Sequence, residues 1–443
     1  MRSAIVQHSH KRVAHPQLDV ERVALPNGLV LLLSENHSTP SVSINGMVLA
    51  GSRFEMDHKA GLASLTGALL DSGTTTRTSQ QIAETVEAVG GHLATFGEYQ
   101  SSGVVVTLLS RDTQLGLEIA SDLLLNATFP DDKVQQEIAR RVAQLKSRLD
   151  EPRIQASDVF NEIVFGAAPL HRPSVGYDRT VNALIRADIE GFYGRFYVPN
   201  NTIIAIVGDI DKGEIKARVT SLFGSWERAE FERPTVIKPE RQTAPIARFV
   251  TVSKEQVNIF IGHVGIERRN SDFYSLLVMD TILGSSPGFT SRIPRVLRDE
   301  QGLAYSTFST ITSSATLDPG RFIAFIGTAP ANLGRAIAGL RSEIQRIVDE
   351  PVTAEELEVA KLYLTGSFVF RFQKNAQIAD FLIDAEVYGL GFDYLERYPD
   401  LIRAVTVEDI SRVARKHIDP MSLTTVAVGP VDETGNVIKK EGD

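Results

Sequence analysis

An internal repeat constrains the fold of this chain more than any other feature of its sequence. Residues 188–211 match residues 409–432 at a constant offset of 221 positions. In this alignment Pro199 corresponds to Pro420, and the glycine after the apolar stretch of one copy corresponds to the glycine in the other. Each copy has the pattern of a helix, a proline-containing turn and a buried strand. A period this long indicates a duplicated domain rather than a solenoid.

The chain of 443 residues is long enough for two domains, and its composition, 43% hydrophobic and 23% charged, is that of a globular protein. The segment 226–247 is charged and contains three prolines, which is typical of a linker. The predicted organisation is therefore a flexible arm (1–18), a first domain (19–225), a linker (226–247), a second domain (248–433) and a flexible tail (434–443).

Bulk properties exclude several classes of function. The sequence has no cysteine, so it can form no disulfide, thiol nucleophile or Cys-ligated zinc site. A net charge of −9 argues against nucleic-acid binding, and the absence of a long apolar run argues against a membrane span. The N-terminus lacks the apolar core of a signal peptide, so a cytoplasmic location is expected by default. A periplasmic location stays open if a leader has been removed.

A Gly- and Ser-rich loop, Gly284–Arg292, precedes a possible functional pair. Apolar residues at 293–297 recur at helical spacing, which predicts a short helix that carries Arg298 and a strand that opens near Leu303. Arginine offers a permanently charged, planar donor fork, and Tyr305 offers a neutral donor. Together they suit a carbonyl oxygen that gains negative charge during acyl chemistry. A surface arginine and a half-buried strand tyrosine would have the same local pattern.

This segment resembles the second-half signature of the insulinase-like (pitrilysin, M16) zinc metallopeptidases, which include the mitochondrial processing peptidase. The likeness extends from about Val20 to Asp432 and includes Gly61-Leu62-Ala63, Gly90-Gly91 and Asn126–Phe129 in the family's order. In that family an Arg and a Tyr at this spacing hold the scissile carbonyl of the substrate. The resemblance implies this role for Arg298 and Tyr305. It also implies a position beside the substrate for four loop residues, Gly284, Ser285, Ser286 and Gly288.

The family's zinc motif is missing from this chain. In catalytic members the helix bracketed here by Gly61 and Gly73 holds His-x-x-Glu-His, which supplies two zinc ligands and a general base. At the three motif positions this chain has Ser64, Gly67 and Ala68. The family's third ligand aligns with Gln135, and Glu137 lies two residues further on. We therefore expect no metal and no other cofactor in this chain.

The resemblance also implies the fold class and the assembly. Each half is expected to be an α+β, sandwich-like domain with a mixed, mostly antiparallel sheet and helices on one face, as in mitochondrial-processing-peptidase-like metallohydrolases. In two-chain members four such domains enclose a chamber, and one subunit can lack the zinc motif yet keep the Arg/Tyr pair. This chain is accordingly interpreted as a non-catalytic subunit, inactive alone, that pairs with a homologous zinc-bearing subunit around a peptide substrate. It would supply Arg298 and Tyr305 in trans.

Three other functions fit less of the sequence. The first is a peptide-binding or structural protein without hydrolytic activity, like the respiratory-complex core subunits descended from this family. A second is an enzyme with Ser64 as its nucleophile, but no histidine is near in sequence and no nucleophile-elbow pattern surrounds it. The loop 284–288 could also cradle a phosphate, yet it lacks the Gly-Lys-Ser/Thr ending of such loops.

Overall fold

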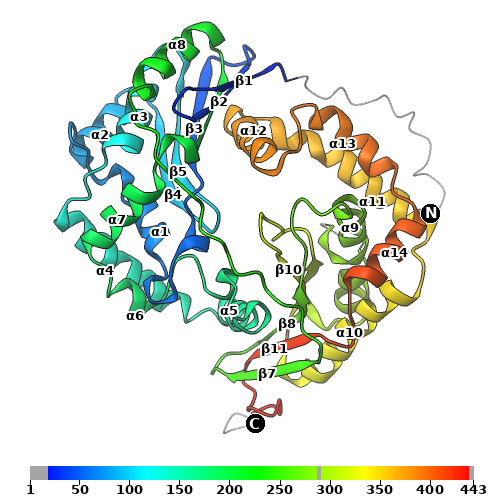
Figure 1. Ribbon diagram of the computed structural model, residues 1–443. Coiled ribbons are helices and arrows are strands. Elements are labelled where there is room, and N and C mark those ends of the chain that lie inside the picture. The colour runs from blue at the N-terminus through cyan, green and yellow to red at the C-terminus, as the bar shows by residue number, and fades with distance from the viewer. Residues whose placement is uncertain (1–17, 287–290, 439–443) are drawn as a thin grey trace.

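The computed structural model describes residues 18–286 and 291–438. All but the last residue of the predicted arm 1–18, the last five residues of the predicted tail, and Gly288 of the loop lie outside the described residues. The chain forms two sheets, one in each half, and helices pack against both. In Figure 1 the first half, blue to green, faces the second half, which runs from green through yellow to red.

The first sheet has six strands in the spatial order β1-β2-β6-β3-β5-β4. Strands β2 and β6 are parallel, and every other neighbouring pair is antiparallel. The seven apolar or small residues of β6 are all buried, which agrees with its place inside the sheet. The strands are β1 (Val20–Ala24), β2 (Val30–Glu35), β3 (Ser41–Val48), β4 (His92–Gly97), β5 (Ser102–Leu109) and β6 (Thr202–Gly208).

Helices of the first half begin at recognisable sequence signals. Thr78 forms a capping box with Gln81 at the start of α2, and Pro152 occupies the first turn of α5, where its missing N–H costs no hydrogen bond. The helices are α1 (Leu62–Ala68), α2 (Ser79–Glu87), α3 (Thr113–Asn126), α4 (Asp131–Arg148), α5 (Pro152–Phe165), α6 (Asp178–Val181), α7 (Arg186–Phe196) and α8 (Lys212–Phe223).

The second sheet repeats the first with one strand fewer. Its order is β7-β11-β8-β10-β9, so these strands take the places of β2, β6, β3, β5 and β4 in turn. Only β7 and β11 are parallel. The strands are β7 (Ile246–Thr251), β8 (Val257–Val264), β9 (Ala304–Thr310), β10 (Arg321–Thr328) and β11 (Thr424–Gly429). The predicted class, two similar α+β halves with mostly antiparallel sheets, is confirmed.

Helices of the second half include two segments of the wider π type. Thr353 forms a capping box with Glu356 at the start of α11. The helices are α9 (Phe273–Asp280), α10 (Leu333–Asp349), α11 (Ala354–Ser367), α12 (Asn375–Tyr388), α13 (Tyr394–Arg403) and α14 (Val407–His417). The π-helical segments are η7 (Thr281–Ser285) and η8 (Pro294–Glu300), and η10 (Phe368–Phe372) is a 3₁₀ helix.

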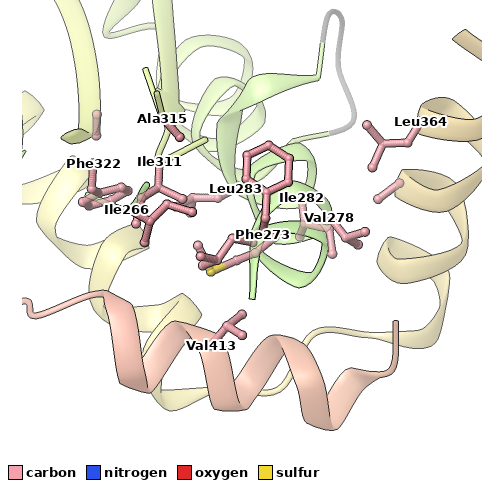
Figure 2. Packing of buried hydrophobic residues seen from close by; sticks show 14 of the residues in the cluster. Ile266, Phe273, Val278, Ile282, Leu283, Ile311, Ala315, Phe322, Leu364 and Val413 are labelled. Carbon is pink, nitrogen blue, oxygen red and sulfur yellow. The ribbon is translucent and has the colours of Figure 1, made fainter. Parts of the chain in front are cut away.

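The core of the second half is built around α9 and η7. Figure 2 shows Phe273, Ile282 and Leu283 from this region between Val413 of α14 and Leu364 of α11. On the other side lie residues of the β8–β10 region, among them Ile266, Ile311 and Phe322. Apolar contacts on both sides hold η7, and with it the start of the loop that precedes Arg298, against the core.

The two halves exchange one helix each. Helix α5 of the first half packs on β8 and β11, whereas α12 of the second half packs on β3 and β6. These strand pairs occupy matching positions in the two sheets, so the exchange is reciprocal. Figure 1 shows α12 beside the first sheet and α5 beside the second. The predicted bounds 19–225 and 248–433 stay a prediction, because each includes a helix that covers the other half's sheet.

The exchanged helices bury apolar and polar groups between the halves. On α5, the fully buried Phe160 packs against Phe260 of β8, with ring centroids 6.1 Å apart. Arg321 of β10 donates a hydrogen bond of 3.0 Å to Ser157 Oγ on the same helix. On α12, Leu382 belongs to a core cluster that extends into the first sheet. Unfolding of one half would therefore expose the sheet of the other.

Candidate functional site

The predicted pair, Arg298 and Tyr305, lies at the outer edge of the second sheet. Arg298 is in the π-helical segment η8, and Tyr305 is the second residue of the edge strand β9, on which η8 packs. A tight turn joins the two elements: the Gly302 N–H donates to Arg298 O over 3.2 Å, and Gly302 has a φ of +63° that favours glycine. The spacing of seven residues thus follows from one turn between helix and strand.

Tyr305 is the most exposed large side chain on this edge. Its side chain is 92% exposed, although strands usually bury aromatic residues in their sheet. Among the described residues, no hydrogen bond reaches its hydroxyl. The predicted strand and helix are both present, but the sequence did not indicate how far the phenol projects into solvent.

Arg298 is held by its neighbour in the chain. Its Nε donates to Asp299 Oδ1 over 2.8 Å, and this hydrogen bond raises the pKa of the already cationic guanidinium further. The side chain is about one third exposed, 30%. A π-helical turn leaves a wider local backbone than an α-helix, and such turns occur often at functional sites. The predicted short helix is present, but its π geometry was not predicted.

A buried carboxylate ties the start of the loop to β9. Asp280, the last residue of α9, accepts hydrogen bonds from the Ile311 N–H (2.9 Å) and the Thr312 N–H (2.9 Å), just after β9. It also accepts from the hydroxyls of Thr310 (3.0 Å) and Thr312 (2.6 Å). Burial raises the pKa of Asp280 to about 6. An Asp inside the apolar run 276–283 was the sequence signal for this anchor, and it was missed.

The loop residues proposed to lie beside the substrate are fixed where the structure describes them. A Cβ atom on Gly284 would lie 2.5 Å from Ser309 N of β9, so η7 lies directly on the strand. At the other end Arg292, only 2% exposed, makes a bidentate ion pair with Glu356 of α11, at 2.7 and 2.8 Å. Ser285 and Ser286 lie between these two anchors, whereas Gly288 is outside the described residues.

The three positions of the lost zinc motif lie on α1 in the first half. Ser64 and Gly67 are buried, and Ala68 is partly buried. The start of the helix is held by Glu55, which accepts hydrogen bonds from the N–H groups of Gly61 (3.1 Å) and Ala63 (2.5 Å). Burial raises the pKa of Glu55 to about 8. Glu55 thus fixes the start of the helix that carries the three positions.

Glu137 rather than Gln135 faces α1. A cavity of about 270 Å³ is lined by Ala68 and Asp71 on one side and by Glu137 and Arg140 of α4 on the other. Gln135 is exposed and does not line this cavity. Asp71 has its pKa raised by burial and, to a lesser degree, by the nearby charge of Glu137. Of these two residues, Glu137 is thus the one that lies beside α1, and the assignment of the third-ligand position to Gln135 stays a prediction.

The residues at this site do not fit a zinc ion. Zinc needs about four donors from Cys, His, Asp or Glu, and Ser64, Gly67 and Ala68 supply none of them. Across residues 18–286 and 291–438, no group of three or more His, Asp or Glu side chains is placed to hold a metal.

Within the same ranges, no helix is long and apolar enough to cross a membrane.

Comparison with known proteins places the two halves in one family. The family model described as insulinase (peptidase family M16) matches residues 30–175, and the model described as peptidase M16 inactive domain matches residues 183–364. An uncharacterized zinc protease of Mycobacterium tuberculosis is 27% identical over 414 residues, which cover 92% of this chain and 93% of that protein. An uncharacterized zinc protease of Bacillus subtilis is 25% identical and covers 80% and 85% of the two chains.

Solved structures share the fold of the whole chain. A peptidase M16 inactive domain from Pseudomonas fluorescens superposes with a TM-score of 0.87 at 22% identity, over 96% of this chain and all of that one. A protease from Helicobacter pylori gives a TM-score of 0.85 at 20% identity, over 93% and 99%. The fold therefore defines a peptidase-like protein that consists of two similar halves. The chain belongs to the M16 (insulinase) peptidase family, as the resemblance predicted.

Proposed function

We propose that this chain is the non-catalytic subunit of a heterodimeric M16-type peptidase. A homologous subunit with an intact His-x-x-Glu-His motif would hold the zinc ion, and this chain would form the other half of the peptide chamber. Arg298 and Tyr305 would reach the scissile carbonyl in trans. The observation that carries the proposal is the contrast between the two halves. The first half lacks the residues of the zinc motif, whereas the second half exposes the side chain of Tyr305 to solvent.

The chemistry of the pair supports this role. A carbonyl oxygen that becomes negative during peptide hydrolysis is stabilised by donors that are already in place. Arg298 would donate from its guanidinium, which also pairs with Asp299. Tyr305 would donate from its hydroxyl, which no described residue occupies. Asp280 and the Arg292–Glu356 pair hold the surrounding elements, so little ordering would be needed when a peptide binds.

The sheet edge supports peptide binding beside the pair. Strand β9 is the outer strand of the second sheet, and Ala304, Tyr305 and Ser306 at its start are half-buried or exposed. Where η7 and η8 do not cover it, an outer strand offers backbone N–H and C=O groups to an extended peptide. A peptide along β9 would therefore pass next to Tyr305. No ion pair or metal in this chain is needed for that contact.

The proposal is tested on the complex purified from its native source with this chain as bait. We expect a second subunit of similar size, one zinc ion per two chains, and peptide hydrolysis by the complex only. Arg298→Ala should lower kcat by roughly 10²–10³, the scale of losing one oxyanion donor, with assembly intact. Tyr305→Phe should also lower kcat, because it removes only the hydroxyl.

Arg295→Ala is the matched control, since Arg295 lies on the same segment η8 and its side chain is 46% exposed. This variant should retain the activity of the wild-type complex. If Arg298→Ala leaves kcat unchanged as well, the trans role is wrong. A zinc-free assembly without hydrolysis would instead support a peptide-binding or structural protein of the same family.

A further inference from the structure

Helix α1 lies so close to the edge strand β4 that a lost motif position has no space for a side chain. A Cβ atom on Gly67 would lie 2.2 Å from Phe96 O and 2.7 Å from Gly97 N. From the other side, a Cβ atom on Gly97 would lie 2.3 Å from Ala63 O. All three neighbours are backbone atoms, which cannot rotate away as side chains can. Any residue larger than glycine at either position requires helix and strand to move apart.

Only one of the three motif positions opens toward the cavity that Glu137 lines. Ala68 lines this cavity, whereas Ser64 and Gly67 do not. Ser64 is instead close to β4, because a Cβ atom on Gly97 would lie 2.8 Å from Ser64 Cα. Positions 64 and 68 are one helical turn apart, so histidines there would share one face of α1. The contact between α1 and β4 instead leaves no space for the glutamate that the motif places at position 67.

The carboxylate that α4 directs toward this cavity, Glu137, is already paired with cations of the same helix. Glu137 accepts hydrogen bonds from Arg140 Nε (2.6 Å) and Arg140 Nη2 (2.5 Å), and from Arg141 Nη2 (3.2 Å). Its side chain is only 12% exposed, and Lys133 lines the same cavity. A bidentate guanidinium is the strongest partner that a side chain can offer a carboxylate. These cations occupy the acceptor sites that a metal ion would need.

We infer that the degenerate metal site is closed, and that restoring His-x-x-Glu-His alone does not restore zinc binding. Two features close it: the contact of Gly67 with β4, and the pairing of Glu137 with Arg140 and Arg141. The inference concerns this chain by itself and does not depend on the proposed role in trans.

The first test measures the cost of a side chain at position 67 in the full chain. Gly67→Ala should lower Tm by several degrees, because one methyl group already meets strand backbone. Gly191→Ala is the matched control: Gly191 lies in α7 of the same half, and a Cβ atom there meets nothing within 4 Å. Alanine favours a helix over glycine, so this control should keep or raise Tm. An unchanged or higher Tm for Gly67→Ala would overturn the first part of the inference.

The second test measures zinc binding after the ligands are restored. The variant S64H/G67E/A68H should retain no more zinc than the wild-type chain after gel filtration, as measured by mass spectrometry of the metal, and zinc should not raise its Tm. Stoichiometric zinc with a zinc-dependent rise in Tm would refute the closure. The variant S64H/A68H keeps Gly67 and so remains informative if the triple variant does not fold.

In the S64H/A68H background, a zinc-dependent rise in Tm should appear or increase only when Arg140 and Arg141 are both replaced by Gln. Ligands that bind only the folded state raise Tm in this way. If zinc stabilises S64H/A68H equally with and without the two arginines, pairing with Glu137 does not close the site.

Discussion

Asp280 is the residue whose removal should most disturb the elements that carry the proposed catalytic pair. Its carboxylate is completely buried and is the acceptor for two backbone N–H groups, those of Ile311 and Thr312. In Asp280→Ala both donors lose their partner inside the core. Each buried, unsatisfied donor costs about 1–3 kcal/mol, so the free energy of unfolding should fall by about 2–6 kcal/mol. That loss is large beside a typical total of about 5–15 kcal/mol.

Asp280→Asn should cost less than Asp280→Ala, because the amide retains one oxygen that can accept from Ile311 or Thr312. Its NH₂ group, however, faces donors. The assay is urea unfolding followed by circular dichroism, which gives the midpoint and the slope for each variant. Asp393→Ala is the control, since Asp393 is on the surface next to α13 and its side chain is 61% exposed. Equal midpoints for Asp280→Ala and wild type would refute the claim that this carboxylate anchors β9.

Three further predictions concern stability. Burial lowers the pKa of His263 from 6.5 to about 4. Between these two pH values the folded state binds fewer protons than the unfolded state, so the free energy of unfolding should fall by up to about 3 kcal/mol as the pH drops through this range. Unfolding of His263→Phe across pH 4–7 should lack this dependence; an unchanged profile would contradict it. Phe160→Ala should cost about 3–5 kcal/mol in thermal or urea unfolding, whereas the exposed Phe370→Ala should cost little. Burial opposes ionisation of Glu356, but hydrogen bonds from Arg292 lower its pKa to about 2. The ionised carboxylate should therefore contribute about 1–2 kcal/mol to the free energy of unfolding, and this contribution should be lost as the pH falls from about 4.5 through 2. The same pH dependence should be absent in Glu356→Gln.

Much of the fold was predictable because its signals are local. The capping box at Thr353 and the buried strand around Val207 both depend on residues a few positions apart, and the strand is present as predicted. The internal repeat predicted two similar halves, and the two sheets have the same strand order apart from one additional strand. The order of strands inside each sheet was not predicted, since pairing between distant segments leaves no local pattern.

The exchanged helices were not predicted. No helix was predicted at 152–165 or 375–388, although Pro152 is a typical first residue of a helix. Neither helix has a strongly amphipathic pattern. Helix α5 packs on the second sheet and α12 on the first, so the sequence of one half does not show which surface its helix will cover.

For the site, the sequence by itself determined which chemistry is possible. A chain with Ser64, Gly67 and Ala68 at the motif positions cannot ligate zinc there, and one with Arg298 and Tyr305 keeps two donors for a carbonyl oxygen. The tertiary structure decided where these groups lie: the contact of Gly67 with Phe96, the choice of Glu137 over Gln135 as the residue that faces α1, and the exposure of Tyr305. Residue types fix which protons and lone pairs are available, whereas distances between segments far apart in the chain depend on packing that no local pattern encodes.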